Sequence, residues 1–91
     1  MIEIKKQSKQ IGQLKKGDKV TVDGHILEVD SQYLFLDHKT TKEMIIELFN
    51  PKTDKEYQIR YFDDQVETSL EFYYLQNDFE YRRAEIKTIE W

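Results

Sequence analysis

Short runs in which apolar and polar residues alternate constrain this fold more than any other feature of the chain. Val20 and Val22, for example, alternate with Lys19 and Thr21. Because successive side chains of a strand point to opposite faces, this two-residue period predicts strands that each bury one face. The composition agrees, since 31 of the 91 residues are Ile, Val, Thr, Tyr, Phe or Trp and alanine occurs once. Such β-branched and aromatic side chains suit a pleated sheet.

Turn signals separate the alternating runs. Asp23-Gly24 follows Val22 directly and predicts a tight hairpin, because both residues tolerate a positive φ. Residues 50–55 form a polar loop that contains the only proline, and residues 76–78 read as a further turn. We therefore predict one all-β domain over residues 1–91, either a small antiparallel SH3-like barrel or a rolled meander of about six to eight strands.

Two segments add detail to this prediction. The sequence Tyr33-Leu34-Phe35-Leu36 is apolar at every position, which predicts a central strand. Thr40-Thr41-Lys42-Glu43 matches a capping box, so a short helix near 41–49 is an alternative to the strand that we favour there. The aromatic residues predicted to lie in the core are Tyr33, Phe35, Tyr57 and Tyr61.

Charge is unevenly distributed along the chain. Residues 1–20 contain six lysines and two acidic residues, a net charge of +4, whereas residues 21–91 contain eight basic and sixteen acidic residues, a net charge of −8. Residues 63–80 contain six carboxylates and no base, and we call this segment the acidic run. A basic first segment and an acidic remainder predict binding partners of different kinds.

Motifs for catalysis or cofactor binding are missing from the sequence. There is no cysteine, and the two histidines, His25 and His38, stand in no recognised metal-ligand spacing. The three glycines are scattered, and no serine lies in a nucleophile motif. We predict no catalytic residue, no metal site and no cofactor. With no secretory or membrane-spanning segment either, the expected compartment is the cytoplasm.

Two blocks resemble the opening of an SH3-like or KOW-type barrel. They are residues 14–20, Leu-Lys-Lys-Gly-Asp-Lys-Val, and residues 22–29, Val-Asp-Gly-His-Ile-Leu-Glu-Val. They are similar to the first domain of the elongation factor P family, and residues 46–55 resemble a later hairpin of that domain, with Asp54 where glycine is usual. The resemblance implies the barrel fold. That family presents a modified lysine on a glycine-rich loop, whereas the corresponding connection here, Asp30-Ser31-Gln32, has neither residue. The translation-factor role is therefore not implied.

Two binding hypotheses follow from the charges. In the first, the protein is a non-enzymatic module that contacts a protein partner, because Tyr73 lies among carboxylates on the strand face opposite Phe72. A row of carboxylates can imitate a phosphate backbone. In one form of this hypothesis, the protein therefore inhibits a basic protein that handles nucleic acid, as small acidic proteins of phages and mobile elements do. Its candidate residues are Asp63, Asp64, Glu67, Glu71, Tyr73, Asp78 and Glu80. In the alternative, the barrel binds RNA or single-stranded DNA directly. The residues of that alternative are Lys5, Lys6, Lys15, Lys16, Arg82 and Arg83.

Overall fold

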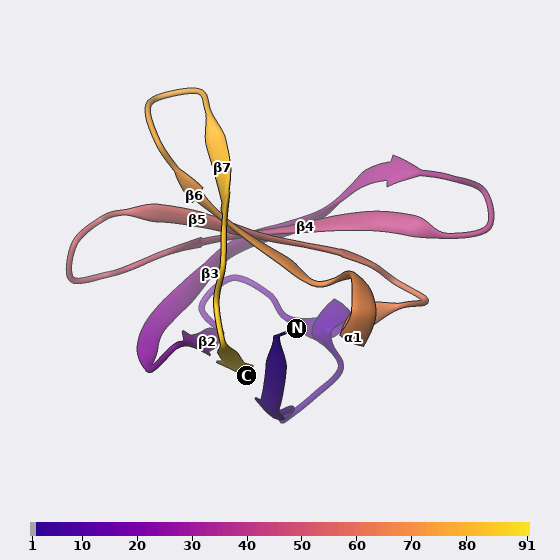
Figure 1. The fold of residues 1–91 in the computed structure, drawn as a ribbon, viewed down its shortest axis with the longest axis horizontal. Coiled ribbons are helices and arrows are strands. Elements are labelled where there is room, and N and C mark those ends of the chain that lie inside the picture. The colour runs from indigo at the N-terminus through magenta and orange to yellow at the C-terminus, as the bar shows by residue number, and fades with distance from the viewer. Residues whose placement is uncertain (1) are drawn as a thin grey trace.

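A tight turn at Asp23-Gly24 forms as predicted. Its residues have φ angles of 48° and 83°, and two left-handed residues in succession match the right-handed twist of the strands that they join. The computed structural model describes residues 2–91, and from this hairpin the chain continues as a meander (Figure 1). The elements are β1 (Glu3–Lys6), a 3-10 turn (Ile11–Gln13), β2 (Lys19–Val22), β3 (His25–Asp37), β4 (Lys42–Phe49), β5 (Glu56–Phe62), α1 (Val66–Ser69), β6 (Glu71–Leu75), β7 (Tyr81–Ala84) and β8 (Thr88–Glu90).

The strands form one sheet in the order β1-β8-β2-β3-β4-β5-β6-β7. Neighbouring strands are antiparallel except β1 and β8, which are parallel. After β7 the chain returns to the start of the meander, where β8 pairs with β2, so the sheet curls into a half-barrel (Figure 1). The predicted small all-β fold is confirmed.

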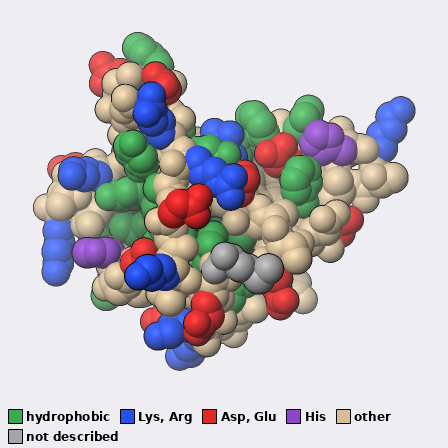
Figure 2. Space-filling view, in the orientation of Figure 1, with side chains coloured by type: hydrophobic (Ala, Val, Ile, Leu, Met, Phe, Trp, Pro, Cys, Tyr) green, Lys and Arg blue, Asp and Glu red, His purple; other side chains and the backbone are tan. Residues whose placement is uncertain are grey.

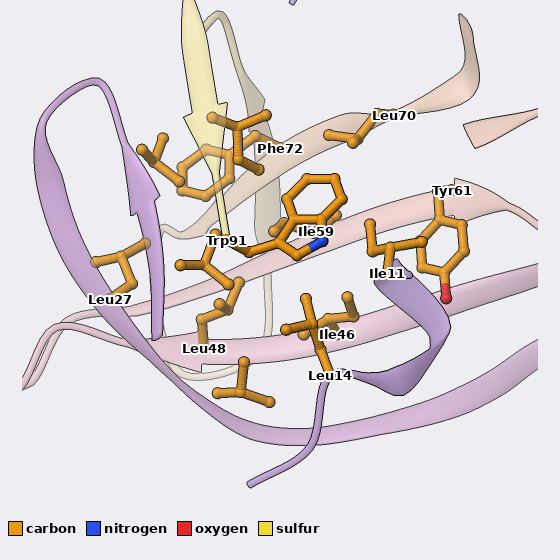
Figure 3. Packing of buried hydrophobic residues seen from close by; sticks show 14 residues of the cluster. Ile11, Leu14, Leu27, Ile46, Leu48, Ile59, Tyr61, Leu70, Phe72 and Trp91 are labelled. Atoms are coloured by element: carbon orange, nitrogen blue, oxygen red, sulfur yellow. The ribbon is translucent and has the colours of Figure 1, made fainter. Parts of the chain in front are cut away.

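The core fills the inside of the curl. Each strand of the meander contributes alternate residues, as the two-residue period requires, and Val20, Ile46 and Ile59 are fully buried. Trp91 packs against this cluster, and its indole N–H donates to the Lys9 carbonyl at 2.7 Å (Figure 3). The cluster consists of Ile11, Leu14, Val20, Val22, Leu27, Val29, Ile46, Leu48, Ile59, Tyr61, Leu70, Phe72, Ile89 and Trp91.

The segment 41–49 is a strand, so the helical alternative is not adopted. β4 pairs with β3 on one side and with β5 on the other, which satisfies its backbone groups along its length. Ile45 and Ile46 are both buried, but only Ile46 belongs to the inner cluster. Ile45 therefore lies on the outer face of the sheet.

The prediction of a central strand at residues 33–36 is wrong. β2 pairs with β3 only along residues 25–28, whereas β4 pairs with β3 as far as Asp37. Beyond Val29, β3 is therefore an edge strand. Tyr33 and Phe35 are 40% and 51% exposed rather than core, and Leu34 and Leu36 are equally accessible. Of the other aromatic residues predicted for the core, Tyr61 is buried and Tyr57 packs against the cluster.

Asp30-Ser31-Gln32 is not a connection between strands. It lies inside the continuous strand β3, at an irregularity in the register between Val29 and Ser31. The Gln32 amide N–H₂ donates to the carbonyls of Ile11 and Leu14 at 3.2 and 2.8 Å, which fixes the 3-10 turn against the sheet.

Within residues 2–91, no helix has the length and hydrophobicity needed to cross a membrane.

Candidate binding surface

The outer face of the sheet contains a stack of one arginine and two aromatic rings. In β5, Ile59 and Tyr61 point into the core, so Arg60 points outward. Its guanidinium carbon lies 4.1 Å from the centroid of the Tyr73 ring and 5.6 Å from that of Phe35. Cation–π contacts of this kind are worth about 0.5–1 kcal/mol at exposed sites and more when water is excluded.

Gln58 orients the arginine within this stack. The Arg60 Nε–H and Nη2–H groups donate to Gln58 Oε1 at 3.2 and 3.0 Å. Gln58 is only 5% exposed, so its amide would be a costly buried group without such partners. The guanidinium is thus held in place before any partner binds.

The strand register adds further side chains to the same face. On β4, Glu43 and Ile45 are two residues apart and point to the same, outer face. Tyr33 pairs with Ile45 and Leu36 pairs with Glu43, so Tyr33 and Leu36 share this face. The register shifts between Leu34 and Leu36, and this bulge places Phe35 beside Leu36 rather than opposite it.

Tyr81 of β7 completes the group, because it pairs with Leu75, two residues from Tyr73 on β6, and therefore lies on the same face as Tyr73. We define the outer aromatic patch as Tyr33, Phe35, Leu36, Arg60, Tyr73 and Tyr81.

The tyrosine hydroxyls of the patch remain hydrogen-bond donors at neutral pH. Partial burial is the main cause that raises the pKa of Tyr33, Tyr73 and Tyr81 above the usual value. Nearby carboxylates raise it further: Glu71 accepts from the Tyr73 hydroxyl at 3.0 Å, and the charge of Glu47 acts on Tyr33 and Tyr81. The patch therefore offers aromatic surface, phenolic donors and one fixed cation.

Two carboxylates of the acidic run stabilise a hairpin. Asp63 Oδ1 accepts from the Lys42 N–H at 2.9 Å and from the Thr41 hydroxyl at 3.2 Å, and Asp64 accepts from the same hydroxyl. The backbone hydrogen bond from Lys42 is the main cause that lowers the pKa of Asp63. These two residues tie the end of β5 to the start of β4.

Two further carboxylates meet the predicted basic residues. Glu71 Oε2 lies 3.2 Å from Arg83 Nη1, and Glu80 Oε1 lies 3.9 Å from Arg82 Nε. In each pair, a carboxylate of the protein-binding hypothesis contacts an arginine of the nucleic-acid-binding alternative. Both pairs lie on the β6–β7 hairpin. They are solvent-exposed ion pairs, so each contributes little to stability.

The remaining candidates lie elsewhere. Glu67, on α1, lines an open hollow of about 420 Å³ together with Tyr61 and Asp63, and Asp78 lies in the β6–β7 turn. The acidic run is thus divided among the end of β5, α1 and the β6–β7 hairpin. Lys5 and Lys6 are in β1, and the other predicted lysines, Lys15 and Lys16, follow the 3-10 turn. β1 and β7, which contains both predicted arginines, are the first and last strands in the sheet order.

Sequence reasoning identified Tyr73 but missed the rest of the outer aromatic patch. The alternation of β5 did place Arg60 opposite Ile59 and Tyr61, and that signal was available. The contacts of Arg60 with Phe35 and Tyr73 could not be predicted from the sequence, because they depend on the register of three strands and on a bulge.

No three His, Cys, Asp or Glu side chains among the described residues lie close enough together to hold a metal ion. Comparison of the chain with protein-family models, with curated proteins and with solved structures gives no match. The fold and the surface geometry are therefore the basis for the functional argument.

Proposed function

We propose that this protein is a non-enzymatic binding module that acts by contact between its outer aromatic patch and a protein partner. The supporting observation is the preorganised stack of Arg60 between Phe35 and Tyr73 on an open sheet face. Tyrosine and arginine are among the residues most often found at the energetic centre of protein interfaces. A guanidinium held by Gln58 loses little conformational entropy on binding.

The exposed apolar surface supports the same proposal. Phe35 and Leu36 remain about half exposed on a part of β3 that, among residues 2–91, pairs with β4 alone. Contiguous apolar surface bordered by polar groups is typical of interaction sites. A partner that covered this strand would remove from water the side chains that the fold leaves exposed.

The form of the proposal in which the acidic run imitates a phosphate backbone has less support. Four of its six carboxylates are engaged by groups of the chain itself: Asp63 and Asp64 by β4 and its preceding turn, and Glu71 and Glu80 by arginines of β7. Aromatic and arginine contacts are therefore the expected source of affinity, and the two other carboxylates, Glu67 and Asp78, would act mainly on partner choice and association rate.

Capture of a partner by matched variants tests the proposal. The protein is immobilised and exposed to a lysate of the cells that express it naturally, and bound proteins are quantified by mass spectrometry. We expect Arg60→Ala and Phe35→Ser each to reduce capture of a specific partner about tenfold or more, the size of a hot-spot truncation. Arg82→Ala is the control, because Arg82 is an exposed arginine outside the patch.

Each variant is first checked for its far-UV circular dichroism and thermal midpoint. Capture that is equal for the wild type, Phe35→Ser and Arg60→Ala, all folded, would contradict the proposal.

Direct binding of single-stranded nucleic acid is the second candidate, and the same stack favours it. Exposed rings beside an arginine are surfaces on which bases stack. This alternative predicts that fluorescently labelled single-stranded DNA or RNA binds at low salt, that affinity falls steeply as salt rises, and that Phe35→Ser weakens it. Absence of binding to both oligonucleotides at low salt would eliminate this alternative.

A further inference from the structure

The β6–β7 hairpin ends in a phenylalanine that the rest of the chain does not cover. Phe79 is 96% exposed, more than any other large hydrophobic residue among residues 2–91. The turn that presents it is well ordered by hydrogen bonds: Gln76 N–H donates to the Glu80 carbonyl at 2.8 Å, and Asn77 Oδ1 accepts from the N–H groups of Phe79 and Glu80 at 3.1 Å each. The hairpin therefore holds an aromatic side chain out from the body, and Figure 2 shows a hydrophobic side chain among acidic ones at this projecting end.

An apolar hollow lies on the open side of the half-barrel. It has a volume of about 350 Å³ and lies between the β2–β3 turn, the β4–β5 loop and β6. Of its apolar lining, Val22, Leu27 and Phe72 are buried core residues, and Tyr57 and Ile86 are partly exposed. The apolar side chains that line it are Val22, Leu27, Tyr57, Phe72 and Ile86.

The hollow is large enough for the ring of Phe79. An apolar protein cavity of about 150 Å³ already binds benzene. A volume of about 350 Å³ therefore accommodates a benzyl side chain together with atoms of the turn that presents it.

The charges around the two features are complementary. Asp78 and Glu80 flank Phe79 in the sequence, whereas Lys55 lies at the edge of the hollow. Asp23 also lines the hollow, but its Oδ1 is engaged by the chain itself, since it accepts the N–H groups of Lys87 and Thr88 at 2.9 and 2.8 Å.

The hairpin of the same molecule cannot fill the hollow. Phe72 of β6 lines it, and from there β6 leads away to the turn that contains Phe79 (Figure 1). A Phe79 side chain that enters the hollow must therefore come from another molecule.

We propose that the hollow receives the Phe79 tip of a second copy of this chain, with Asp78 of one copy facing Lys55 of the other. Because the two surfaces are different patches, the contact is either exchanged reciprocally in a closed dimer or repeated head to tail in longer assemblies. This interface is separate from the outer aromatic patch and goes beyond the proposed function.

Sedimentation equilibrium over a wide concentration range tests this proposal. We expect the wild type to self-associate reversibly and Phe79→Ser to weaken the association at least tenfold. Asp78→Lys and Lys55→Glu should each weaken it several-fold, and the double variant should recover most of the loss, because the swap restores opposite charges. All three residues are exposed, so the variants are expected to fold normally.

Phe35→Ser serves as the control, because it removes an exposed phenylalanine of the outer aromatic patch. It should leave self-association unchanged. A wild-type protein that stays monomeric at every concentration, or an association that Phe35→Ser abolishes and Phe79→Ser does not affect, would overturn the proposal.

Discussion

Gln32 connects three parts of the fold through one side chain, and its replacement by leucine gives the most informative stability test. Its amide donates to the carbonyls of Ile11 and Leu14 in and after the 3-10 turn, and its Oε1 accepts from the Tyr61 hydroxyl of β5. Gln32→Leu keeps a side chain of similar length but removes all three hydrogen bonds. The Leu14 carbonyl and the Tyr61 phenol, both partly buried, then lose their partner, whereas the Ile11 carbonyl still accepts the Leu14 N–H at 3.1 Å.

The expected cost follows from these lost partners. Each unsatisfied buried polar group costs about 1–3 kcal/mol, and the new leucine recovers part of that by burial. We therefore expect Gln32→Leu to lower the free energy of unfolding by about 3 kcal/mol, a large share of the roughly 5–15 kcal/mol typical of a domain. For a chain of this size, that loss corresponds to a fall of roughly 12–24 °C in the thermal midpoint.

Urea unfolding followed by the fluorescence of Trp91, the only tryptophan, provides the assay. Tyr61→Phe removes only the hydrogen bond to Gln32 and should cost about 1 kcal/mol. The double variant should cost less than the two single variants together, because both remove the same bond. A loss below about 0.5 kcal/mol for Gln32→Leu, or strict additivity with Tyr61→Phe, would refute the reasoning.

Two further predictions concern pH. Burial raises the pKa of Tyr61 to about 12. Because the unfolded chain ionises near pH 10, Tyr61 contributes stability that is present below pH 10 and is lost as the pH rises toward 12, by about 2–3 kcal/mol in all. The wild type should therefore lose more stability than Tyr61→Phe between pH 10 and 12 in urea titrations, and parallel curves would contradict the burial of this phenol. At the acidic end, the N–H groups of Thr88 and Lys87 hold the pKa of Asp23 below its usual value. Its stabilisation is present above the ordinary carboxyl pKa and is lost as the pH falls below it. Asp23→Asn, which tolerates the same positive φ, should unfold with a weaker dependence on pH in this range, as circular dichroism during acid titration would show, and an unchanged acid midpoint and slope would count against the contact.

The sequence predicted those parts of the fold that depend on local information. Asp23-Gly24 specifies its own turn through the φ angles of two residues, and the alternation in β5 places Ile59 and Tyr61 inward whatever their neighbours are. The capping box at residues 40–43 was outweighed by tertiary pairing, since strands lie on both sides of β4.

The candidate surface could not be predicted from the alternation of apolar and polar residues, because it depends on which strands pair with each other. Residues 33–36 are as apolar as a central strand, but β2 stops pairing with β3 at Glu28, and Tyr33, Phe35 and Leu36 lie on the outer face of the sheet. The contact of Glu71 with Arg83 likewise requires the pairing of β6 with β7. The acidic run contains no basic residue in the sequence, but in the folded protein an arginine of β7 lies beside it.

Site-specific photo-cross-linking shows whether the outer aromatic patch contacts a protein partner in the cell. A photoreactive phenylalanine analogue is placed at position 35, in the outer aromatic patch, or at position 52, in the exposed β4–β5 loop, and the cells that express the protein naturally are irradiated. We expect a specific adduct with another protein from position 35, none from position 52, and loss of the adduct when Arg60→Ala is added. An adduct with the same partner from position 52 alone, or no protein adduct from position 35, would contradict the proposed function.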